Sequence, residues 1–184
     1  MRMPLRIALV GSAGVGKTTL AERLAADLGV PVSPDPVRPL LAELGFTAPN
    51  SLSDGQRLEL CQKVLARRIA FEETHDSFVA DRAALDTAVY WLRWCSRGSN
   101  DATAALVAAA RAHMRRYSHV FLLPWGALPL VDDATRTPDS WYQYGMHALT
   151  LGVLEEWGVE HMAIPKDAVS LKDRVEICRA GAQR

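Results

Sequence analysis

The chain has 184 residues, of which 49% are hydrophobic, and its 21 lysines and arginines balance 21 aspartates and glutamates. A chain of this length can bury about 70% of the surface that it exposes when unfolded, so it suits a single domain over residues 1–184. The balanced charge argues against attraction to nucleic acid or to a membrane surface, and no apolar run is long enough for a membrane span. We therefore expect a cytoplasmic protein with neither kind of partner.

The first half of the chain alternates short apolar runs with helical periodicity. The patterns predict, in chain order, a strand at 5–10, a helix at 17–28, a strand at 30–33, a helix at 37–44 and a helix at 53–74. Gly29 is placed to end the first helix, and Ser53 with Gln56 forms a capping box that begins the last one. The residues expected on the buried face of that last helix are Leu58, Cys61, Leu65 and Ile69.

The second half continues this alternation. It predicts, in chain order, a strand at 77–81, a helix through 85–92, a helix at 102–115, a strand at 119–124, a helix at 141–157, a strand at 160–165 and a C-terminal helix. The polar, turn-rich segment at about 125–140 indicates an exposed lid loop. Five apolar strands that alternate with helices are typical of an α/β fold with a parallel sheet.

Between the first strand and the first helix stands GSAGVGKT, residues 11–18, which matches the P-loop pattern G-x-x-x-x-G-K-[ST]. Its glycines allow backbone N–H groups to turn inward around phosphate oxygens. Lys17 would reach the β- and γ-phosphates of ATP, and the Thr18 hydroxyl would coordinate Mg²⁺. A glycine-rich turn that only connects two elements is the alternative, but the four fixed positions rarely arise by chance. The residues assigned to the nucleotide are Gly11, Ser12, Ala13, Gly14, Val15, Gly16, Lys17, Thr18 and Thr19.

Three charged residues are candidates for the chemistry. Asp81 ends the third strand, at the edge of the sheet beside the P-loop, where it could hold Mg²⁺ or cap the next helix. Asp35 follows the second strand at the same edge, where it could accept a proton from a substrate hydroxyl or serve as the polar residue of a proline-rich turn. Arg136 in the lid could stabilise charge on the transferred group, or it could be a solvated loop residue.

Other polar and aromatic side chains are candidates for binding a second substrate. Arg82 could clamp an anion or form a surface ion pair. Asp86 and Tyr90 lie opposite the apolar face of their helix, where such residues either line an acceptor pocket or face solvent. Four aromatic residues near the lid could stack on a ring or belong to the core: Trp125, Trp141, Tyr142 and Tyr144.

The order of these motifs resembles a family, the P-loop kinase-like group that contains the ribosylnicotinamide kinase portion of NadR and related small AAA-type ATPase domains. The matching pieces are GSAGVGKTT, PDPVRPL, ADRAALDTAVYW and VFLLPWGALPLVDDATRTPDSW. The resemblance implies a three-layer αβα sandwich with a five-stranded parallel sheet of nucleoside and nucleotide kinase type. It further implies that Asp81 lies near the metal, Arg136 on the lid, and Asp35 with Arg38 near the acceptor. Asp35 departs from the glutamate that is more usual at its position, and nothing corresponds to the nucleotidylyltransferase portion of NadR.

The sequence therefore favours a small-molecule kinase that uses Mg²⁺ and ATP and transfers the γ-phosphoryl group to a nucleoside-like or other small hydroxyl acceptor. The acceptor would lie near Asp35, Arg38, Arg82, Asp86 and Tyr90. Two alternatives stay open: a nucleoside monophosphate kinase, whose arginines would neutralise a dianionic acceptor, and an ATP-binding or ATP-hydrolysing switch module. The oligomeric state is also open, with a homodimer among the expectations.

Overall fold

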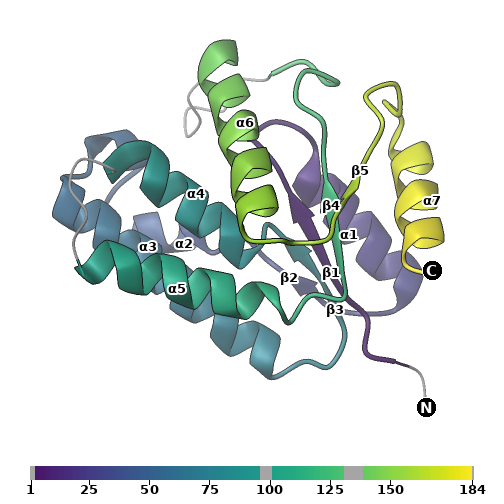
Figure 1. Ribbon diagram of the computed structural model, residues 1–184, viewed down its shortest axis with the longest axis horizontal. Helices are drawn as coiled ribbons and strands as arrows, with labels where there is room; N and C mark the ends of the chain where they lie inside the picture. The colour runs from purple at the N-terminus through teal and green to yellow at the C-terminus, as the bar shows by residue number, and fades with distance from the viewer. Residues whose placement is uncertain (1–2, 96–100, 131–138, 184) are drawn as a thin grey trace.

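The computed structural model, shown in Figure 1, describes residues 3–95, 101–130 and 139–183, without the side chains of Asn50 and Cys95. Its strands are β1 (Arg6–Val10), β2 (Val32–Ser33), β3 (Phe78–Asp81), β4 (His119–Leu122) and β5 (Met162–Ala163). They form one five-stranded sheet in the order β2-β3-β1-β4-β5, and every pair is parallel. The prediction of a five-stranded parallel sheet is confirmed. The edge strand β2 is shorter than predicted because Pro31 lacks an N–H for the ladder, although its carbonyl accepts from Val79 N.

One or two helices follow each strand along the chain, as the periodicity predicts. They are α1 (Lys17–Leu28), α2 (Val37–Glu43), the 3₁₀ turn η1 (Pro49–Ser51), α3 (Asp54–Glu73), α4 (Ala84–Cys95), α5 (Asp101–Met114), α6 (Ser140–Glu156) and α7 (Leu171–Gly181). Gly29 ends α1 in the left-handed conformation, with φ of 67°. The capping box at the start of α3 is present, because Gln56 N donates to Ser53 Oγ and Ser53 N donates to the Gln56 side chain.

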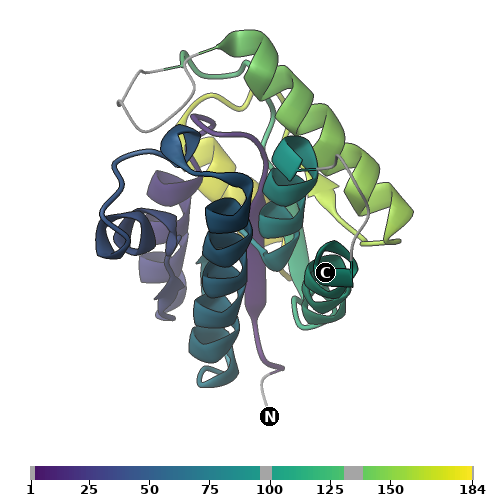
Figure 2. The same cartoon turned by 90° about the vertical axis from the view of Figure 1, so that its left-hand side faces the viewer.

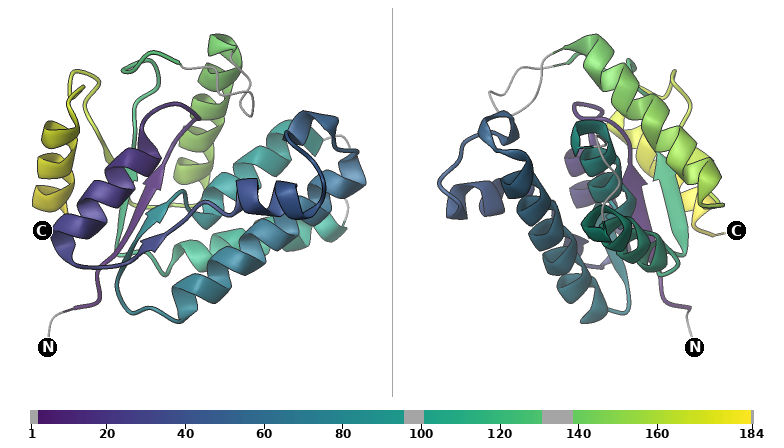
Figure 3. Two further views of the ribbon diagram at one scale, coloured as in Figure 1. Left: turned by 180° about the vertical axis from the view of Figure 1, so that it is seen from behind. Right: turned by 60° about the vertical axis from the view of Figure 1, so that its left-hand side comes forward.

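Helices cover both faces of the sheet, which makes three layers. Alternate residues of the central strand β1 enter different cores: Ala8 and Val10 pack with residues of α3, α4, α5 and α6, whereas Ile7 and Leu9 pack with α1 and α7. Figures 1 and 3 show α1 and α7 together on one side of the sheet, with α3, α4 and α5 on the other. In Figure 2, α3 and α4 stand side by side in front of β1. The predicted αβα sandwich is therefore correct.

The buried face of α3 differs from the predicted one. Of its four expected core residues only Leu65 is fully buried, and the others are partly buried against the main core. An adjacent face of the helix carries Leu60 and Val64, which pack against Leu40 and Leu41 of α2 in a separate cluster. The helix contacts two neighbours, so its apolar positions cover more than the single stripe that the periodicity predicted.

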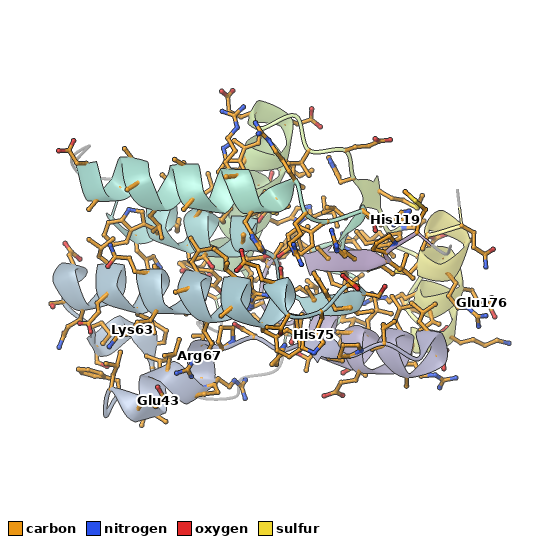
Figure 4. The ribbon with its side chains drawn as sticks, turned by 90° about the horizontal axis from the view of Figure 1, so that it is seen from below. Glu43, Lys63, Arg67, His75, His119 and Glu176 are labelled. Atoms are coloured by element: carbon orange, nitrogen blue, oxygen red, sulfur yellow. The ribbon has the colours of Figure 1, made fainter. Side chains whose placement is uncertain are left out.

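At the surface, α2 is also joined to α3 by an ion pair. Arg67 Nη1 and Nη2 each lie 2.9 Å from a carboxylate oxygen of Glu43. Figure 4 shows the two side chains pointing toward each other between the two helices, with Lys63 one turn away on α3. The pair adds an exposed contact to the apolar packing of α2 on α3.

Two hydrogen bonds hold the start of β1 in place, and a close approach to Phe121 holds the end of α7. At the start of β1, Leu5 N donates to Ser77 Oγ at 3.0 Å and Arg6 N donates to Ser118 Oγ at 2.9 Å, so the turns before β3 and β4 both bind its first amides. At the end of α7, a Cβ on Gly181 would lie 2.8 Å from the Phe121 ring, a contact too close for any larger residue.

Within the described chain, no helix combines the length and apolarity that crossing a membrane requires.

Candidate active site

The carboxyl ends of three neighbouring strands meet at one cavity. The P-loop follows β1, Asp81 ends β3, and Asp35 lies two residues after β2. The cavity has a volume of about 520 Å³, within the range of small-molecule sites. Its charged lining residues are Lys17, Arg38, Arg57, Arg68 and Arg82, with Asp35, Asp81 and Asp86. All five residues predicted for the acceptor line this cavity, together with six of the nine predicted for the nucleotide: Ala13, Gly14, Gly16, Lys17, Thr18 and Thr19. Gly11, Ser12 and Val15 do not line it.

Glycine is required within the P-loop itself. Gly11 has φ of +135°, and a Cβ there would lie 3.0 Å from the carbonyl oxygen of Leu123 on the neighbouring chain segment. Gly16 has φ of +86° and precedes the first residue of α1. The N-terminus of α1 therefore opens directly onto the loop, where unpaired helix N–H groups favour an anion.

Lys17 is buried inside the loop. Its side chain is 5% exposed, and Nζ donates to the carbonyl oxygens of Gly11, at 2.8 Å, and of Ser12. Burial lowers the pKa of Lys17 from 10.5 to about 7, and the positive charge of Arg82 adds to this effect. Nearby carboxylates offset only part of the shift.

The two residues predicted to hold Mg²⁺ lie in contact. Thr18 Oγ1 donates to Asp81 Oδ2 at 2.6 Å, and Asp81 is buried. In the described part of the chain no three His, Cys, Asp or Glu side chains form a metal cage, so a cation here would take its remaining ligands from phosphate oxygens and water. At the start of α4, Asp86 in the first turn accepts through Oδ2 from Ala83 N at 2.8 Å, so Asp86 satisfies an N–H group at this end of the helix.

The side of the cavity where the sequence predicts an acceptor centres on Arg82. Its Nε donates to Asp35 Oδ2 at 2.8 Å, its Nη1 lies 3.5 Å from Asp86 Oδ1, and its guanidinium lies 5.3 Å from the centre of the Tyr90 ring. The side chain is only 15% exposed, so the pair with Asp35 is not the surface ion pair that the sequence left open. Burial raises the pKa of Asp86, although the charge of Arg82 opposes this.

Asp35 and Arg38 lie at the mouth of this region. The side chain of Asp35 is 25% exposed, and its Oδ1 accepts from Val37 N at 3.3 Å at the start of α2. Asp35 therefore shapes the proline-rich turn and lines the cavity at the same time. Arg38, one residue later on α2, is exposed and also lines the cavity.

Two buried charged residues on α3 were missed by the sequence reasoning. Arg68 is 2% exposed; its Nη1 donates to the carbonyl oxygen of Arg82 at 2.6 Å and lies 3.7 Å from Glu72. These contacts support an unusual backbone, because Arg82 has φ of +74° and is the only non-glycine residue with positive φ in the described chain. Glu72 in turn accepts from Ser33 Oγ and Tyr117 Oη. The spacing of Arg68 and Glu72, one helical turn apart, is the signal that could have indicated a pair.

Aromatic residues close the far end of the cavity. Trp94 and Tyr142 line it and are hydrogen-bonded, with Trp94 Nε1 donating to Tyr142 Oη. Trp125, Trp141 and Tyr144 instead contact one another outside it, and Trp141 is 75% exposed. Of the four aromatic residues predicted near the lid, Tyr142 is partly buried against the main core, as expected for one or two of them, whereas Trp141 and Tyr144 are exposed.

Gln143 is a third residue that the sequence did not indicate. It lies on α6, it is 2% exposed, and its Oε1 accepts from Ala13 N of the P-loop at 2.9 Å. Arg136 and residues 131–138 of the expected lid lie outside the described residues. The described ends of that segment, Leu128 and Ser140 among them, line a smaller hollow beside the P-loop.

Comparison with known proteins identifies the family. A family model described as an AAA domain matches residues 6–174. The chain belongs to the AAA domain family. A search of curated proteins finds no match to the sequence.

Solved structures share the fold of this AAA domain at low sequence identity. A deoxyadenosine kinase from M. mycoides with bound dATP has a TM-score of 0.70 at 11% identity, covering 98% of this chain and 100% of that one. The YorR protein of Bacillus subtilis, in complex with phosphorylated GDP, has a TM-score of 0.63 at 12% identity, covering 96% and 95%.

The NadR protein in complex with NAD and AMP-PNP has a TM-score of 0.70 at 15% identity. The match covers 99% of this chain and 50% of NadR, so the chain spans half the length of that protein. The family model confirms the expected relationship to small AAA-type ATPase domains, and the solved structures confirm the expected fold.

Proposed function

We propose that this AAA domain is a small-molecule kinase that binds ATP and Mg²⁺ at the P-loop and phosphorylates a hydroxyl group held near Asp35. The observation that carries the proposal is the single cavity that joins the P-loop to Asp35, Asp86 and Tyr90. A nucleotide switch needs no second compartment beside its phosphate site, whereas a kinase does. The bound dATP and AMP-PNP of the structural neighbours support the nucleotide part of the proposal.

The residues present fit a magnesium nucleotide. The cavity is lined by more basic than acidic side chains, which suits a polyphosphate, and the buried Ser12 hydroxyl has no hydrogen-bond partner in the described structure. Thr18 and Asp81 are the residues that would hold Mg²⁺, with Asp81 acting directly or through water. The cation, when bound, neutralises phosphate charge that builds up during transfer.

In the proposed reaction, Asp35 accepts the proton of the acceptor hydroxyl while the hydroxyl oxygen bonds to the γ-phosphorus and ADP leaves. Arg82 orients the Asp35 carboxylate for this role, since Nε donates to Oδ2 at 2.8 Å. Lys17 and the P-loop amides hold the phosphates in line. Trp94, Tyr90 and Tyr142 would enclose the acceptor at the far end of the cavity.

A panel of acceptors tests the proposal. ADP release would be measured with nucleosides, nucleotides and sugars in the presence of Mg²⁺. We expect one class of acceptor to stimulate turnover, and we expect Asp35→Asn to lower kcat by about a hundredfold or more with little change in ATP affinity. Asp76→Asn, which alters an exposed aspartate after α3, is the matched control. Slow ADP release that no acceptor stimulates would instead support the switch module.

A nucleoside monophosphate kinase is the second candidate. The observation in its favour is that Arg38 and Arg57 line the cavity together with Arg68 and Arg82, and arginine is well suited to a phosphate dianion. The same panel separates the two candidates. A monophosphate kinase should prefer nucleoside monophosphates to nucleosides, and Arg38→Ala should then raise KM for the monophosphate more than KM for ATP.

A further inference from the structure

The P-loop is held from outside by a buried arginine near the end of the chain. Arg174 on α7 is 2% exposed, and its Nη1 donates to the carbonyl oxygen of Val15 at 2.7 Å. Its Nε donates to the carbonyl oxygen of Ala168 at 2.6 Å, in the turn before α7. Arg174 does not line the cavity, so it acts on the loop rather than on a ligand.

The contact with Val15 determines the direction of one loop amide. The carbonyl of Val15 and the N–H of Gly16 belong to the same peptide unit, and no peptide bond in the described chain is cis. In a trans peptide the C=O and N–H point in opposite directions. Because the Val15 carbonyl points toward Arg174, the Gly16 N–H points away from α7, and Gly16 itself lines the cavity.

The Ser12–Ala13 peptide is also held by a side chain, but its carbonyl and N–H point in the opposite directions. Ala13 N donates outward to Gln143, and the carbonyl of Ser12, in the same peptide unit, accepts inward from Lys17 Nζ. Of these two peptides, the Ser12–Ala13 unit therefore has its carbonyl facing Lys17, as the carbonyl of Gly11 also does, and the Val15–Gly16 unit has its carbonyl facing α7. Each is held by a side chain that is distant in sequence, since Gln143 lies 130 residues from Ala13 and Arg174 lies 159 residues from Val15.

We propose that Arg174 is a positioning residue for triphosphate binding: by holding the Val15 carbonyl it keeps the Gly16 N–H turned toward the phosphates. This inference rests on the proposed ATP site. Gly16 permits the arrangement, because a Cβ there would lie 3.3 Å from Arg174 Nη1. An arginine suits this role, since its planar group binds the carbonyls of Val15 and Ala168 through two separate nitrogens, whereas a lysine would have to reach both from one.

The test compares Arg174→Met with two controls on the same helix. Arg179→Met removes an exposed arginine, and Val175→Ala destabilises α7 from within its apolar core. We expect Arg174→Met to raise the Kd for Mg·AMP-PNP about ten- to hundredfold, in line with losing a hydrogen bond to a charged group. Arg179→Met should bind like the wild type, and Val175→Ala should lower Tm without a comparable loss of affinity.

Steady-state kinetics and rescue separate positioning from a merely structural role. In Arg174→Met, KM for ATP should rise more than kcat falls. Ethylguanidinium should restore part of the affinity of Arg174→Ala, and Arg174→Lys should fall between the wild type and Arg174→Met. The inference is overturned if Arg174→Met binds Mg·AMP-PNP as the wild type does, or if Val175→Ala with an equal loss of Tm loses as much affinity.

Failure of the proposed ATP site gives a different experimental result from failure of the Arg174 inference. If the wild type binds no Mg·AMP-PNP, the ATP site itself is refuted, and a crystal structure of Arg174→Met then decides the role of Arg174. A rotated Val15–Gly16 peptide in that structure would support positioning of the loop, and an unchanged peptide would overturn it.

Discussion

At the scale of single residues, the ionisation of Lys17 depends strongly on the fold. Its ammonium group lies against loop carbonyls instead of water, and burial brings its pKa to about 7. A bound triphosphate would place negative charge beside it and raise this pKa again. Binding above about pH 7 would then be accompanied by proton uptake at Lys17.

The pKa of Lys17 predicts a pH dependence of stability. Between about pH 7 and about pH 10.5 the unfolded chain keeps a proton that the folded chain has released, so the free energy of unfolding should rise with pH across this window. Below pH 7 the full cost of burying the charge remains. Denaturant unfolding of the wild type and of Lys17→Met at several pH values measures this. As pH rises, the free energy of unfolding of the wild type should increase relative to that of Lys17→Met. If the two free energies change with pH in parallel, the pKa assigned to Lys17 is contradicted.

A second prediction concerns the backbone of Arg82. Its φ of +74° is unfavourable for residues that carry a Cβ, whereas glycine adopts it without strain. Arg82→Gly and Arg82→Ala lose the same contacts with Asp35 and Asp86, so their difference isolates the backbone. We expect Arg82→Gly to be the more stable by about 1 kcal/mol in urea unfolding. Equal stability, or greater stability of the alanine variant, would show that the strain is absent.

At the scale of elements, α2 illustrates which contacts hold a helix at the site. Its exposed pair between Glu43 and Arg67, seen in Figure 4, is bidentate but solvated, whereas Leu40 is 2% exposed in the cluster with Leu60 and Val64. Surface ion pairs contribute little, while buried leucines contribute several kcal/mol. The attachment of α2 therefore depends mainly on its apolar side.

Two variants of α2 test this. Leu40→Ala should lower the free energy of unfolding by about 2–5 kcal/mol, because it leaves a cavity between α2 and α3. Glu43→Gln on the same helix should leave it almost unchanged, and any small effect should fade at high salt. Thermal unfolding of both variants measures the contrast, and comparable losses would mean that the ion pair has the larger role.

At the scale of the whole molecule, the site joins elements from both faces of the sheet. The P-loop is continuous with β1 and α1, Gln143 reaches it from α6, and Arg174 reaches it from α7. A ligand that binds this loop should therefore stabilise the fold as a unit rather than one segment of it. In α5 and at the amino ends of the strands, by contrast, no residue lines the cavity.

Ligand binding should accordingly raise the melting temperature. At AMP-PNP concentrations about 100 times Kd, the expected gain in the free energy of unfolding is about 2.7 kcal/mol. Removal of Mg²⁺ with EDTA should reduce this gain, since Thr18 and Asp81 would no longer share a cation with the phosphates. Scanning calorimetry with and without Mg²⁺ checks both statements. A gain that EDTA does not alter would argue against the metal role of Thr18 and Asp81.

Most of the fold was predictable, because the signals for it are local. Apolar runs, Gly29 and the Ser53 capping box each predict an element from neighbouring residues, and those elements are present. Two exceptions have different causes: Pro31 shortens β2 locally, whereas tertiary contact with two neighbours widens the buried face of α3.

The site was predictable only in part. Asp35 and Arg82 could be expected near the P-loop because parallel strands bring their carboxyl ends together. Three other residues could not be expected there: Gln143, Arg174 and Arg68. A polar residue on a helix usually faces solvent, and the neighbouring sequence does not indicate that its side chain binds a distant backbone group.

The hydroxyls of Ser77 and Ser118 accept hydrogen bonds from the first amides of the β1 segment, and this attachment has a mechanical consequence. A pulling force applied to the chain before β1 would act along the strand and load both flanking ladders at once, in shear. Because the same strand continues directly into the P-loop, a displacement of β1 along its axis would also displace that loop and the cavity beside it.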